Sequence, residues 1–117
     1  MDDRKALLER LIALEEPLKP IQEALTKFKW DCEALVCLTP SHIADILRRY
    51  LDGAISADVV EDWADTVELR DDIGFQAPHE SLIREVVYQL ASPLLTRPLN
   101  FLKAQKLLGR IESALRD

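Results

Sequence analysis

Carboxylates that could bind a cation or move a proton are concentrated in the middle of the 117-residue chain. Residues 56–80 carry eight acidic side chains and one basic side chain, so this segment has a net charge of −7 in a chain of net charge −6. Clustered carboxylates can attract a cationic partner, hold a hard metal ion or act as general acids and bases. The eight acids are Asp58, Glu61, Asp62, Asp65, Glu68, Asp71, Asp72 and Glu80.

The spacing of these acids predicts a charged row on one face of a helix. At about 100° per residue, three of them fall within about 60° of one another, a fourth joins if the helix continues, and two flank the row. Like charges four residues apart destabilise an isolated helix by roughly 0.2–0.5 kcal/mol per pair, which the positive helix N-terminus partly offsets. The three residues within about 60° are Glu61, Asp65 and Glu68. The fourth is Asp72, and Asp58 and Asp62 flank the row.

The acidic row has three interpretations. It is a docking face for a protein partner with a basic surface, a solvated face that only keeps the chain in solution, or a carboxylate metal site. We expect no metal and no other cofactor, because the sequence lacks an EF-hand loop and a di-iron E-x-x-H pair, and ligands on one helix cannot surround an ion. Negative potential also disfavours DNA and RNA as partners.

The docking interpretation predicts a partner-binding set that includes the one cation of the segment. We expect this cation, Arg70, to pair with Glu68, Asp71 or Asp72, or to reach a neighbouring helix through bidentate contacts. A solvated acidic face is instead expected in a structural or oligomeric module, for which a homodimer held by an apolar helix face is predicted. The partner-binding set is Asp58, Glu61, Asp62, Asp65, Glu68, Arg70, Asp71 and Asp72.

Catalysis is not expected from the remaining reactive side chains. His42 and His79 each lie at the start of a predicted helix, where a capping or surface role is more typical than that of a base. Cys32 and Cys37 do not have the C-x-x-C spacing of a redox or zinc site, and we expect both to be small buried residues in a reducing compartment. No nucleophile elbow, Walker loop or H-E-x-x-H motif is present.

The expected compartment is the cytoplasm. The first residues, Met-Asp-Asp-Arg-Lys-Ala-Leu-Leu, do not have the basic and apolar regions of a signal peptide. No apolar run approaches the roughly 20 residues that a membrane span needs, so no membrane association is expected.

The chain, including the segment that holds the acids, is predicted to be helical almost throughout. Apolar residues recur at helical spacing, and Pro, Gly, Ser and Thr mark the boundaries. We therefore predict an all-α fold: a single-domain bundle of five to six antiparallel helices over residues 1–117. The predicted helices cover 3–15, 20–38, 40–51, 57 onward, 79–91 and 100–115, with a loop at 70–78 and no strand.

Several anchor positions follow from this pattern. Thr39, Ser56 and Asn100 are expected to cap helices, and Gly53 to end one in a left-handed conformation. Trp63 lies in register with the apolar residues of its helix and is predicted to anchor the core. In the last helix, Leu115 is expected to be packed, along with Leu107, Leu108 and Ile111.

Three short patterns mark the middle of the chain: a G-x-I-S start at 53–56, W-A-x-x-x-E-x-R-D-D-I at 63–73 and an L-A-x-P stop at 90–93. Through these patterns, about half of the chain resembles a group of small uncharacterised bacterial all-helical proteins. It implies that Trp63, Glu68, Arg70, Asp71 and Asp72 mark a site. In size and charge the chain is also similar to bacterial immunity proteins, which implies an immunity- or antitoxin-like inhibitor that binds a cationic protein.

Overall fold

The structure, a computed structural model, describes residues 3–15, 17–26, 36–70, 72–93 and 98–116. Six α-helices and two three-residue strands lie in these ranges, which confirms the predicted all-α class. In chain order they are α1 (Asp3–Ile12), α2 (Leu18–Leu25), β1 (Val36–Leu38), α3 (Pro40–Leu51), α4 (Ala57–Glu68), β2 (Ile73–Phe75), α5 (Glu80–Ala91) and α6 (Phe101–Arg116).

Predicted capping residues fix the starts of three helices. The Thr39 hydroxyl accepts the amide of His42, and the His42 Nδ1 accepts the amide of Thr39 at 3.1 Å, so α3 begins with a reciprocal capping box. Ser56 Oγ accepts an α4 amide at 3.3 Å, and Asn100 Oδ1 accepts an α6 amide at 2.8 Å. Gly53, with φ of +81°, follows α3 in the left-handed region, as predicted.

The predicted helix over 20–38 is wrong in its last residues. Helix α2 ends at Leu25, residues 27–35 lie outside the described ranges, and Val36–Leu38 form β1, which pairs in parallel with β2. Burial alternates along β1, because Val36 and Leu38 point into the core and Cys37 is exposed. The expectation that Cys37 is buried is therefore also wrong, and Cys32 lies outside the described residues.

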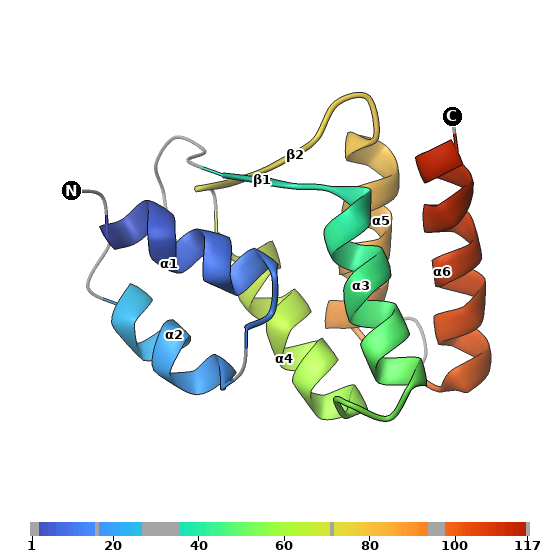
Figure 1. The fold of residues 1–117 in the computed structure, drawn as a ribbon, viewed down its shortest axis with the longest axis horizontal. Helices are drawn as coiled ribbons and strands as arrows, with labels where there is room; N and C mark the ends of the chain where they lie inside the picture. Colours follow the sequence, from blue (N-terminus) through green and yellow to red (C-terminus); the bar gives the residue numbers. More distant parts are fainter. Residues whose placement is uncertain (1–2, 16, 27–35, 71, 94–97, 117) are drawn as a thin grey trace.

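The helices pack mainly in three pairs (Figure 1). Helix α3 packs against α6, α4 against α5 and α1 against α2, and α1 also packs against β1. The last turn of α6 differs from the prediction: Leu115 is 42% exposed, and Ala114 is buried instead. The buried residues of α6 keep the predicted helical spacing, but in the last turn the buried position is Ala114 and not Leu115.

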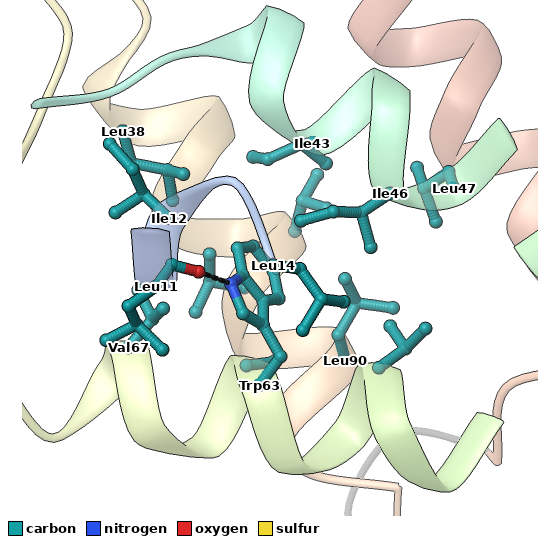
Figure 2. Packing of buried hydrophobic residues seen from close by; sticks show 14 of the residues in the cluster. Leu11, Ile12, Leu14, Leu38, Ile43, Ile46, Leu47, Trp63, Val67 and Leu90 are labelled. Atoms are coloured by element: carbon teal, nitrogen blue, oxygen red, sulfur yellow. Dashed lines mark hydrogen bonds between the residues drawn. The ribbon is translucent and has the colours of Figure 1, made fainter. Parts of the chain in front are cut away.

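Trp63 anchors the core, as predicted. Its side chain is fully buried, and its Nε1–H donates to the backbone oxygen of Leu11 at 2.7 Å. Figure 2 shows the indole of α4 close to Ile46 of α3 and to Leu14, which follows α1, with the hydrogen bond directed to Leu11 in the last turn of α1. Because the indole N–H is a buried donor, this bond fixes how α4 is rotated against α1.

We expect Trp63→Phe to lower the free energy of unfolding by about 2 kcal/mol. The phenyl ring removes the buried donor, leaves the Leu11 carbonyl without that partner and opens a small cavity. Urea denaturation followed by circular dichroism measures the change. The exposed Tyr88→Phe is the control and should change stability by no more than about 0.5 kcal/mol. Equal losses in both variants would contradict the anchoring role.

Candidate functional site: an acidic helix face

Helix α4 has one apolar side and one acidic side. Its buried residues are Val60, Trp63, Ala64 and Val67, so the packing of this side against the core directs the opposite side outward. Five exposed carboxylates occupy that outer side, and α4 contains no Lys or Arg. These five residues, the α4 acidic face, are Asp58, Glu61, Asp62, Asp65 and Glu68.

The α4 acidic face is not neutralised by the described part of the chain. Ion pairs among the described residues join other groups, such as Arg48 with Glu112 at 3.0 Å and Arg110 with Glu85 at 2.6 Å, and none includes a carboxylate of this face. Arg70 lies near Glu68 and Asp65 but is bonded to Asp72, so the exposed carboxylates of the face direct their negative potential into solvent. These five carboxylates are therefore exposed along one side of α4, as the sequence predicts for them.

A shallow hollow lies beside the face. It has a volume of about 560 Å³ and is bounded on one side by carboxylates of α4 and on the other by residues 91–93 at the end of α5. A side chain from a partner could enter this hollow and meet several carboxylates at once. The lining acids are Asp58, Glu61, Asp62 and Asp65.

The electrostatic surroundings of Glu68 differ from those of a paired carboxyl. The pKa of the Glu68 carboxyl is raised above its ordinary value, first by partial desolvation and then by the negative charge of Asp65. A carboxyl paired with a cation would instead have a lowered pKa. The direction of this shift thus fits a face that has no internal counter-charge.

Asp72 does not belong to the outward row, which corrects the prediction for this residue. Its side chain is fully buried and lies between two arginines. Arg70 donates from Nε to Oδ1 at 2.9 Å and from Nη2 to Oδ2 at 2.8 Å, while Arg4 donates from Nε and Nη2 to Oδ2 at 3.1 and 2.9 Å. Arg70 thus takes one of its three expected partners. Asp71 lies outside the described residues.

The course of the backbone explains why Asp72 turns inward. Helix α4 ends at Glu68, so the helical register that would have carried Asp72 to the outer face stops one turn earlier. The chain then enters β2 at Ile73, whose side chain is buried. Arg4 comes from α1, 68 residues away, and nothing in its sequence surroundings marks it as a partner of Asp72.

The other reactive side chains have structural or isolated positions. His42 closes the α3 capping box, and burial lowers the pKa of its imidazole, although Asp45 acts in the opposite direction. This favours the neutral ring, whose Nδ1 can accept the Thr39 amide. His79 precedes α5 and makes no side-chain capping hydrogen bond, and the thiol of Cys37 is free and exposed. Within the ranges described, no three His, Cys, Asp or Glu side chains form a metal-binding group.

We expect Asp72→Asn to lower the free energy of unfolding by about 3 kcal/mol at pH 7, because it leaves two part-buried guanidinium groups without their carboxylate. Burial alone would raise the pKa of Asp72, but hydrogen bonds and charge from Arg70 and Arg4 outweigh it and lower that pKa. The contribution is therefore complete above the unfolded pKa of about 3.9 and is lost as pH falls toward the lower folded value.

Urea denaturation between about pH 7 and pH 2 tests this assignment. The difference in stability between the wild type and Asp72→Asn should narrow in acid. The exposed Asp52→Asn, a matched control, should change stability by no more than about 0.5 kcal/mol at either end of the range. A difference for Asp72→Asn that stays constant from neutral to acidic pH would contradict a salt-bridged Asp72.

Comparison with known proteins adds no relative to this description. No helix in the described ranges has the length and apolar character required to cross a membrane. The chain matches no protein-family model, no curated protein and no solved structure.

Proposed function

We propose that this chain is a small acidic protein-binding module that docks a partner with a basic surface through the α4 acidic face. The observation that carries the proposal is the set of five exposed carboxylates on one rigid helix, none of them paired within the described residues. A face of one charge sign accelerates the approach of an oppositely charged surface and disfavours wrong partners.

The surroundings of the face support a docking role over chemistry. Trp63 and the buried side of α4 hold the helix in place, so the carboxylates are presented without a large ordering cost on binding. The hollow beside Asp58 and Asp62 gives a basic side chain room to approach them. We therefore propose a binding role for these carboxylates and not a catalytic one.

The specific form that we propose is an immunity- or antitoxin-like inhibitor that acts in the cytoplasm. An inhibitor of this kind covers a cationic site on its target with a fixed array of carboxylates. The chain has the corresponding net charge of −6, and the W-A-x-x-x-E-x-R-D-D-I pattern includes Glu68 of the face and the Arg70–Asp72 pair that secures its end. Nucleic acid and membrane surfaces are not proposed as partners, because both carry negative charge.

A structural or oligomeric module is the second candidate. It is favoured by large apolar side chains that the described structure leaves exposed near α5 and α6. Phe101 and Leu102 are 57% and 60% exposed, and Tyr88 and Leu115 are each 42% exposed. Exposed apolar side chains of this size offer surface that a second copy could cover.

Capture of partners from a lysate of the source cells tests the docking proposal. The immobilised wild type should retain a basic protein that is released as salt rises, because exposed charges are screened over about 10 Å at 0.1 M ionic strength. The triple variant Glu61→Gln, Asp65→Asn, Glu68→Gln should retain at least tenfold less of that protein. Quantitative mass spectrometry of the eluates measures the ratio.

A second triple variant controls for net charge. Glu9→Gln, Glu23→Gln, Asp52→Asn removes the same number of charges from exposed positions outside α4 and should capture as much as the wild type. Equal capture by all three proteins, or equal loss in both variants, would overturn the assignment of the docking site to the α4 acidic face.

A further inference from the structure

A second surface has the opposite charge. Helix α6 carries Lys103, Lys106, Arg110 and Arg116, and its one acid, Glu112, is paired with Arg48. Three of these cations line a groove of about 390 Å³ between α5 and α6. The groove also contains the amides of Gln89 and Asn100 and the apolar side chains of Leu102 and Leu107.

The cations of the groove remain accessible although two of them have internal contacts. The Lys103 ammonium donates to the backbone oxygen of Gln89 at 3.0 Å. Arg110 donates from one nitrogen to Glu85, and the two side chains are 44% and 50% exposed, so the pair stays in contact with solvent. Lys106 is exposed on the same side of the helix. The groove therefore presents positive charge beside an apolar surface.

We infer that this groove binds the α4 acidic face of a second copy of the chain. The inference rests on the proposed function, because it names a partner for the same docking face. Leu69, Asp65 and Glu61 follow one another at intervals of four residues along α4 and its C-terminal end. Leu102, Lys106 and Arg110 have the same interval along α6.

Antiparallel packing of the two rows brings each residue beside a complementary one. Four residues advance a helix by about 6 Å, so the register does not drift over the three pairs. Leu69, 65% exposed, then meets Leu102, 60% exposed, and the carboxylates of Asp65 and Glu61 meet Lys106 and Arg110. Rows of side chains four residues apart are also the ridges that pack most often between helices.

Residues of each row line the same or adjoining hollows, so each row forms one continuous surface. Asp65 and Leu69 line a single hollow, Glu61 and Asp65 line the next one along α4, and Leu102, Lys106 and Arg110 all line the α6 groove. Helices α4 and α6 of one molecule do not pack against each other as main partners: α6 packs on α3 and α4 on α5, and α3 lies between α4 and α6 in Figure 1. The contact therefore joins different copies, as a two-fold dimer if both contacts close together and as a head-to-tail chain if they do not.

Sedimentation velocity over a concentration series tests the inference with two charge-reversed variants. One is Glu61→Lys, Asp65→Lys on α4, and the other is Lys106→Glu, Arg110→Glu on α6. The wild type should self-associate at about 0.1 M salt and dissociate at higher salt. Each variant alone should self-associate at least tenfold more weakly, and an equimolar mixture should associate again, because opposite charges then face each other across the contact.

The control variant Glu9→Lys, Glu23→Lys makes the same charge change on α1 and α2 and should behave as the wild type. Circular dichroism confirms that every variant is folded. A monomeric wild type at all concentrations, undiminished association of either reversed variant, or a mixture that stays monomeric would overturn the inference. A monomeric chain that still captures a basic protein through α4 would leave the proposed function intact, so the two failures are distinguishable.

Discussion

The burial of one side of α4 is the constraint on which the rest of the account depends. Trp63 fills the centre of the core and donates its indole N–H to the end of α1, so α4 cannot rotate without breaking a buried hydrogen bond. Since the apolar residues of α4 recur at helical spacing, fixing one of them fixes all of them. The five carboxylates lie between or next to these apolar positions in the sequence and therefore face outward, although their charges repel one another. An internal constraint thus creates the external charge pattern.

A second internal interaction separates the acids that stabilise the fold from those that are available to a partner. Asp72 pairs with both Arg4 and Arg70 in a part-buried network that ties α1 to the segment after α4. No carboxylate of the α4 acidic face is ion-paired in the described structure. The pKa of Glu68 is raised, first by desolvation and then by the charge of Asp65, whereas the pKa of Asp72 is lowered by its two arginines. Acids of the same short segment thus have opposite electrostatic surroundings, which net charge alone would not show.

The sequence is sufficient to predict α3, α4, α5 and α6, because each combines an apolar period with a boundary signal such as Thr39, Ser56 or Asn100. It also places the five carboxylates correctly, since the helical period that buries Trp63 exposes them. It does not predict β1, because three residues are too few to reveal a two-residue period and their partner strand lies far along the chain. The burial of Asp72 is missed for a related reason: it depends on where α4 ends and on an arginine 68 residues away.

The most direct test of the central claim is to map by NMR where a cationic probe binds. The probe is a short oligolysine peptide, titrated into the isotopically labelled full chain at low and at high salt. Amide shifts should change along residues 57–69 and at residues 91–93 beside the hollow, and high salt should abolish these changes. Changes spread evenly over all exposed acids of the chain, or none at α4, would contradict an outward-facing α4 acidic face.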